Sequence, residues 1–244
     1  MGDIADVFEE LRRDVVSFVE SLPEADLQKR MPAAPKWTVR DVIAHLAGDA
    51  DGVNSSDFPR EFFNSFGDED AVRVLNEWTA NHVTERKNLS LQEVLKEWDD
   101  SAAKIISTMR GDGPMPEHVP PFADRVLLTD LAVHQQDIFG AFGIERARDA
   151  APIRIAIAGY VAIMGMRLAA ASLPPLRLEA PDKTYVTGEG NPGATVRNTR
   201  FEFFRALSGR RSPEQIKAWD WDGDPEPYIS YFYPYGVRKE ALVE

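Results

Sequence analysis

The sequence contains no cysteine among its 244 residues. This absence excludes disulfides, cysteine-ligated zinc, iron–sulfur clusters and a cysteine nucleophile. Any thiol chemistry would therefore need a sulfur atom from another molecule. Basic residues are also scarce, with 28 Lys and Arg against 40 Asp and Glu, and the formal net charge is −12. This balance disfavours nucleic acid and anionic membrane surfaces as partners.

Long apolar runs are absent as well. The most apolar stretch covers only residues 155–166, between two arginines, whereas a bilayer-spanning helix needs about 20 residues. The N-terminal residues show neither the basic nor the apolar region of a signal peptide. Apolar residues nevertheless make up 43% of the chain, enough to build a core. We therefore expect a folded protein of the cytoplasm.

Helix signals dominate the first two thirds of the sequence. Apolar residues recur at three- and four-residue steps over 4–22, 91–109 and 123–140. Thr38 and Asp41 form a capping box that opens another helix. Weaker patterns predict a helix over 72–82 and an irregular connection over 51–68, and Pro152 opens a long apolar helix that ends before residue 173.

The pattern changes near residue 173. Alternating residues predict short strands over 176–179, 184–187 and 194–197, followed by two short helices. Nearly all of the net negative charge lies before this point. We therefore predict two domains, a helical bundle over residues 1–172 and a small α+β domain over residues 173–244.

The predicted helix over 123–140 carries ionisable groups on its core-facing side. On a helical wheel, Asp130, His134 and Asp137 lie within about 60° of one another, in the centre of the apolar stripe. A buried, unpaired carboxylate costs several kcal/mol unless it becomes neutral. Something must therefore compensate these groups.

A divalent metal ion would compensate them. Asp130 and His134 are four residues apart, so one helix face offers both to one ion, and His45 is the best third ligand. Asp137 or Asp41 could orient a ligand. The alternatives are a simple Asp–His hydrogen bond and a satisfied core histidine.

Two further histidines are weaker candidates. His82 shares a helix face with Trp78 and fits a core position, and His118 lies in a Pro-rich loop. Neither has a nearby sequence partner that would complete a ligand pair.

Three segments resemble the mycothiol-dependent maleylpyruvate isomerase family of the DinB-like superfamily. Trp37–Ala47 and Thr129–Ile138 are similar to its two metal-site signatures, and Phe203–Arg211 is similar to its C-terminal Gly-Arg element. The resemblance implies a mainly α fold, in which an up-down four-helix bundle is followed by a small α+β domain.

The resemblance also implies a site. A divalent metal, usually zinc, would be held by His45, Asp130 and His134, with an open position for mycothiol or another low-molecular-weight thiol. Arg210 carries over as a catalytic and cofactor-binding residue. This chain departs from the family's isomerases at Asp130, where they carry the longer Glu, so the resemblance does not fix the substrate.

The expected function is therefore a metal-dependent enzyme that uses the thiol for cis–trans isomerisation, or for S-transfer, on a small electrophilic substrate. One alternative is a non-catalytic DinB-like protein that binds a small molecule or a partner, with a vestigial or structural metal site. Another is an iron(II) oxygenase, since two His and one carboxylate also describe its facial triad. The apolar helices are compatible with a homodimer.

Overall fold

The structure, a computed structural model, describes residues 3–57, 59, 65–113, 119–120 and 122–244. Contacts between Cα atoms divide the chain into two units. One comprises residues 1–63, 73–146 and 244, and the other comprises residues 64–72 and 147–243. The domain boundary predicted at 172/173 stays a prediction.

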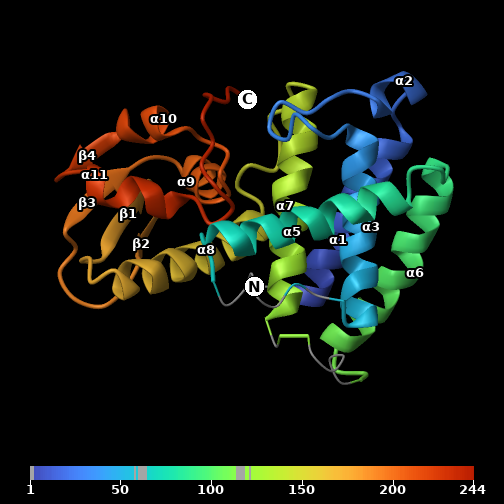
Figure 1. Cartoon of the computed structure of the whole chain (residues 1–244), viewed down its shortest axis with the longest axis horizontal. Helices are drawn as coiled ribbons and strands as arrows, with labels where there is room; N and C mark the ends of the chain where they lie inside the picture. Colours follow the sequence, from blue (N-terminus) through green and yellow to red (C-terminus); the bar gives the residue numbers. More distant parts are fainter. Residues whose placement is uncertain (1–2, 58, 60–64, 114–118, 121) are drawn as a thin grey trace. The chain divides into compact units, whose positions relative to one another are not determined.

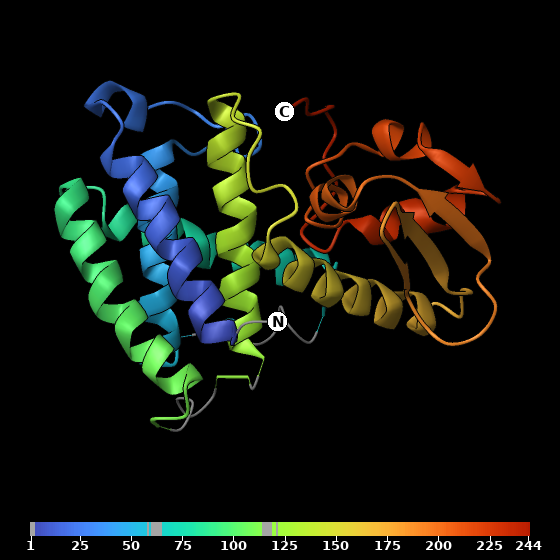
Figure 2. The same cartoon turned by 180° about the vertical axis from the view of Figure 1, so that it is seen from behind.

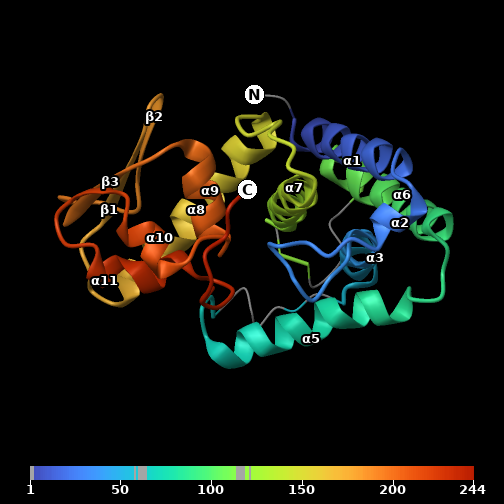
Figure 3. The same cartoon turned by 90° about the horizontal axis from the view of Figure 1, so that it is seen from above.

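The regular elements described in the first unit are helices, as the apolar periodicity predicts. They are α1 (Ile4–Glu20), α2 (Glu24–Leu27), α3 (Val39–Ser55), α5 (Glu69–Glu85, from residue 73 onward), α6 (Leu91–Met109) and α7 (Ala123–Ala141). The bundle consists of α1, α3, α6 and α7, which pack as the pairs α3–α6, α1–α7, α1–α6 and α3–α7. Figure 3 looks nearly along α3 and α7, with α1 and α6 tilted beside them. In Figure 1, α5 crosses α3 instead of running along it.

The interior of the bundle is apolar along most of its length. Phe8 and Val15 lie seven residues apart on one face of α1 and are buried, as are Trp98 of α6 and Leu128 of α7. Helix α3 is longer than the sequence predicts, because its buried face continues beyond residue 51 through Gly52 and Val53.

Helix α3 begins at the predicted capping box. The Thr38 hydroxyl accepts a hydrogen bond from the Asp41 amide (3.2 Å), and the Asp41 carboxylate accepts one from the Thr38 amide (2.8 Å). The Asp41 carboxylate is therefore part of the cap at the start of α3.

Replacing Thr38 with alanine should lower the free energy of unfolding by about 1 kcal/mol, because one amide at the start of α3 loses its acceptor. Urea denaturation of the Thr38→Ala and Thr38→Ser variants measures this effect. Serine should retain most of the stability. Equal stability of the wild type and the alanine variant would contradict the capping role.

The second unit combines one long helix with a small sheet. Helix α8 (Ala151–Ala170) precedes the strands β1 (Leu176–Ala180), β2 (Lys183–Val186), β3 (Ala194–Arg197) and β4 (Asp220–Asp222), and the helices α9 (Arg200–Leu207), α10 (Pro213–Lys217), α11 (Glu226–Ile229) and η1 (Ser230–Phe232). Figure 2 shows this sheet together with α8.

The sheet has the strand order β2-β1-β3-β4. Leu178 of β1 lies opposite Tyr185 of antiparallel β2 and opposite Val196 of parallel β3. The sequence predicts the first three strands but not β4, whose residues look like a polar turn. Pairing of Val196 with Trp221 makes them a strand.

Helix α8 is apolar on most of its surface. In the described part of the chain it is the one helix long and apolar enough to cross a membrane by length and composition, and 44% of its most apolar window is buried. Core helices of globular proteins pass the same test, so this is weak evidence for a membrane span.

Candidate metal centre

Helix α3 delivers His45 to the interior of the bundle. The imidazole is 3% exposed and faces a carboxylate on each edge. Its Nδ1 atom lies 3.3 Å from Oδ1 of Asp49, one turn further along α3. Its Nε2 atom lies 3.3 Å from Oδ2 of Asp130 on α7. His45 is therefore the centre of the cluster.

Helix α7 supplies Asp130 and His134 from one face, as the helical wheel predicts. Nε2 of His134 lies 3.7 Å from Oδ1 of Asp130. On the other edge of the same ring, Nδ1 of His134 lies 3.0 Å from Oδ2 of buried Asp137. Asp137 therefore lies beside His134, and its role in orienting a ligand stays a prediction.

The structure brings the three predicted metal ligands together. One ligand atom each from His45, Asp130 and His134 lies within 4.8 Å of the others. Arg210 belongs to the other unit of the chain, where its guanidinium donates a hydrogen bond to the Ser208 carbonyl (2.6 Å). Its role in catalysis or cofactor binding stays a prediction. His118 lies outside the described residues.

Two members of the cluster lie outside the predicted ligand set: Asp49, which the sequence analysis does not single out, and His82, a weaker candidate there. Asp49 and His82 are both buried, and Nδ1 of His82 lies 3.3 Å from Oδ1 of Asp49. Asp49 follows His45 by four residues, the same spacing that places Asp130 and His134 on one helix face. The sequence therefore contains a signal that could have found Asp49. His82 has no such signal, because only tertiary packing brings α5 to α3.

The buried ionisable groups of the cluster shift one another's pKa values. Burial raises the pKa of Asp130, but the imidazoles of His134 and His45 outweigh it and hold that pKa well below its usual range. Burial raises the pKa of Asp49 well above its usual range, an effect that His45 opposes and Asp130 reinforces. Burial and then the Arg86 guanidinium lower the pKa of His82 to about 4. At neutral pH, Asp130 is therefore ionised and His82 is neutral.

An aromatic side chain borders the cluster. The ring of Trp37 lies 4.9 Å from the His45 ring and 6.0 Å from the His134 ring, between centroids. Access from solvent is uneven, because the side chain of Asp130 is 31% exposed whereas those of His45 and His134 are 3% and 7% exposed. The cluster is therefore open on the Asp130 side.

The donor set matches the requirements of a divalent cation. Within the described residues, Oδ2 of Asp130 is buried and has no hydrogen-bond partner, so a charge on this oxygen calls for a cation. Two imidazoles and one carboxylate are typical of catalytic zinc sites, which keep a fourth position open. The residues present therefore fit such an ion.

The first unit is thus a helical bundle with a buried His/carboxylate cluster inside it. Residues 8–139 match the family described as the mycothiol maleylpyruvate isomerase N-terminal domain. The chain belongs to this family. A comparison with curated proteins finds no significant match.

Two solved structures share the fold. One is the mycothiol-dependent maleylpyruvate isomerase, with 16% sequence identity and a TM-score of 0.54 over 85% of this chain and 88% of that one. The other is a mutant of a mycothiol-dependent maleylpyruvate isomerase, with 13% identity and the same TM-score over 84% and 88%. These likenesses confirm the predicted DinB-like bundle with its small C-terminal sheet. At such low identity they show the fold alone.

Proposed function

We propose that this chain is a metal-dependent enzyme that uses a low-molecular-weight thiol, of the mycothiol type, on a small electrophilic substrate. The observation that carries the proposal is the buried convergence of His45, Asp130 and His134 within 4.8 Å. Family membership supports a thiol cofactor, since the family is named for mycothiol. The lack of cysteine in the chain fits a sulfur atom supplied by a cofactor.

His45, Asp130 and His134 would hold a divalent ion, zinc by the chemistry of the donors. When bound, such an ion supplies the Lewis acidity that deprotonates a coordinating thiol. Oδ2 of Asp137 lies 3.0 Å from Nδ1 of His134, so Nε2 is the nitrogen of this ring that would bind the ion. Trp37 limits access of water on its side of the two rings.

The reaction we propose is cis–trans isomerisation of an activated double bond. The thiol sulfur adds to one alkene carbon, a proton is taken up at the adjacent carbon, and the bond between them becomes single. Rotation about this bond, loss of the proton and elimination of the thiol restore the double bond in the trans form. S-transfer would be the same addition without elimination. Arg210 would bind an anionic group of the cofactor or substrate.

The partners we propose are small molecules, the thiol and its substrate, acting in the cytoplasm. The net charge of −12 disfavours nucleic acid and anionic membranes. A homodimer stays a prediction.

Thiol binding can be measured without knowing the substrate. The zinc-loaded chain should melt at a higher temperature with mycothiol, by an amount equivalent to about 2.7 kcal/mol at 100 times the dissociation constant. Bacillithiol, glutathione and coenzyme A complete the thiol panel, and S-methylated mycothiol is the matched control, which should give a much smaller shift. If no thiol shifts the melting temperature, the non-catalytic alternative replaces the enzyme proposal.

A further inference from the structure

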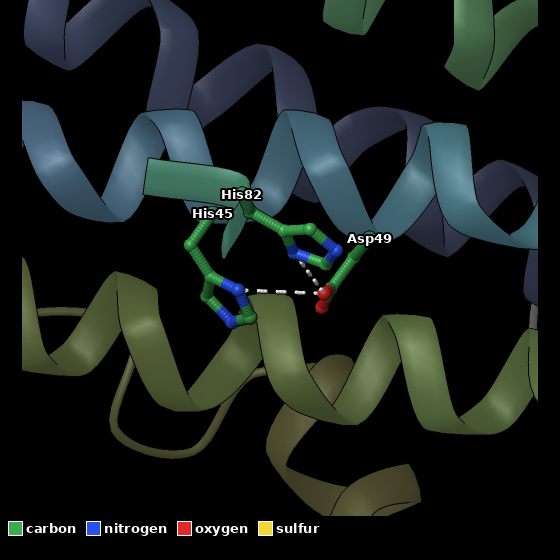
Figure 4. Close-up of side chains that lie close together, drawn as sticks. All are labelled: His45, Asp49 and His82. Atoms are coloured by element: carbon green, nitrogen blue, oxygen red, sulfur yellow. Dashed lines mark ion pairs between the residues drawn. The ribbon is translucent and has the colours of Figure 1, made fainter. Parts of the chain in front are cut away.

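Asp49 and His82 lie on the far edge of the His45 ring from Asp130. Figure 4 shows both imidazoles directing a nitrogen toward the Asp49 carboxylate. Nδ1 of His45 and Nδ1 of His82 each lie 3.3 Å from Oδ1 of Asp49. The three residues are 3%, 5% and 8% exposed for His45, His82 and Asp49, respectively. This part of the cluster is closed to solvent.

These three atoms do not form hydrogen bonds with one another. In the part of the chain that the structure describes, His45 Nδ1, Asp49 Oδ1 and His82 Nδ1 are all buried without a hydrogen-bond partner. The 3.3 Å separations are longer than a normal N–H···O bond of about 2.7–3.2 Å. A tetrahedral shell with zinc–ligand bonds of about 2.0–2.1 Å has edges of about 3.3–3.4 Å. Both separations therefore match the edges of such a shell, and one ligand atom from each of the three residues lies within 4.8 Å of the others.

The packing of α3 makes room for this arrangement. A Cβ atom added to Gly48 would lie 2.3 Å from Cγ of His82 and 2.5 Å from its Cβ. Glycine at this position lets the His82 ring lie against α3 beside Asp49. The guanidinium of Arg86, one turn beyond His82, is already paired with Glu97 at 2.5 Å. Asp49 therefore faces imidazoles and another carboxylate, with this arginine committed elsewhere.

We propose that Nδ1 of His45, Asp49 and Nδ1 of His82 form a second ligand set for a divalent cation of the zinc or cobalt type. It shares His45 with the set that contains Asp130 and His134. A neutral imidazole has one lone pair for a metal ion. His45 can therefore be a ligand in only one of the two sets at a time, and the chain binds one ion. The closed set would hold the ion away from solvent, and the Asp130 set would expose it. This inference deepens the proposed function, because it rests on the same ion.

The test removes the first set and asks whether an ion still binds. In the Asp130→Asn/His134→Gln double variant, equilibrium dialysis against Zn²⁺ alone should still give one ion per chain. Cobalt should give the visible absorption of a tetrahedral site. Adding His82→Gln should weaken binding at least about 100-fold, since even residues that only orient ligands are worth 10- to 100-fold.

Adding Gly48→Ala to the double variant should also abolish binding, although it removes no ligand. Alanine favours a helix by about 1 kcal/mol over glycine, so α3 itself should form. Gly140→Ala is the matched control, because a Cβ there would make only ordinary contacts, the nearest 3.5 Å from Glu244. Circular dichroism and thermal melting report whether each variant folds. His134→Gln alone offers the same test with a single change if the double variant does not fold.

The outcomes separate this inference from the proposed function. A wild type that binds zinc and a folded double variant that does not would overturn the second ligand set and leave the proposed function standing. Zinc that stays in the double variant and is lost from the otherwise wild-type His82→Gln chain would support the second set and contradict the first. A wild type that binds no zinc would overturn both.

Discussion

The His45→Gln variant should lose metal binding almost completely. Among the residues that the structure describes, His45 alone places one ring nitrogen 3.3 Å from Asp49 and the other 3.3 Å from Asp130. Its removal therefore leaves both ligand sets with two members. We expect zinc affinity to fall at least about 100-fold, more than the loss of a residue that only orients a ligand.

Thermal melting with and without zinc measures this prediction. At 1,000 times its dissociation constant, a ligand stabilises the folded state by about 4.1 kcal/mol. The wild type should show this stabilisation and the His45→Gln variant should not. His82→Gln is the control, because it leaves the Asp130 set intact and should retain the zinc effect. Equal stabilisation of His45→Gln and the wild type would show that zinc binds elsewhere.

Removing the metal should abolish thiol-dependent activity. With a small electrophilic alkene that the zinc-loaded chain turns over in the presence of mycothiol, protein treated with a chelator should be at least about 100-fold less efficient, judged by kcat/KM. An unassisted thiol with a pKa near 8.5 is only about 3% ionised at pH 7, and the oriented approach of sulfur to substrate is lost as well.

Reconstitution provides the control for this experiment. Zinc should restore activity, whereas magnesium and calcium should not, because these hard cations prefer all-oxygen sites. Unchanged activity in protein that elemental analysis shows to be metal-free would contradict the metal-dependent reaction.

The sequence predicts most of the bundle because its helices carry local signals. Apolar spacing, the capping box at Thr38 and the face shared by Asp130 and His134 all depend on residues within a few positions of one another. The strand β4 has no such signal, since its residues Asp220–Asp222 become a strand only by pairing with β3.

The site is predicted in part for the same reason. The placement of Asp130 and Asp137 around His134 follows from helix geometry, and that of Asp49 beside His45 follows from the same rule. The approach of His82 does not, because it depends on how α5 crosses α3 over Gly48. Tertiary packing of this kind leaves no periodic trace in one sequence.

Anomalous scattering from crystals of the zinc-loaded protein is the most direct measurement of whether the cluster holds a cation. We predict one peak per chain at about 2.0–2.1 Å from a ring nitrogen of His45, on its Nε2 edge with Asp130 and His134 or on its Nδ1 edge with Asp49 and His82. Protein that contains stoichiometric zinc but shows no peak within bonding distance of His45 would contradict the metal centre.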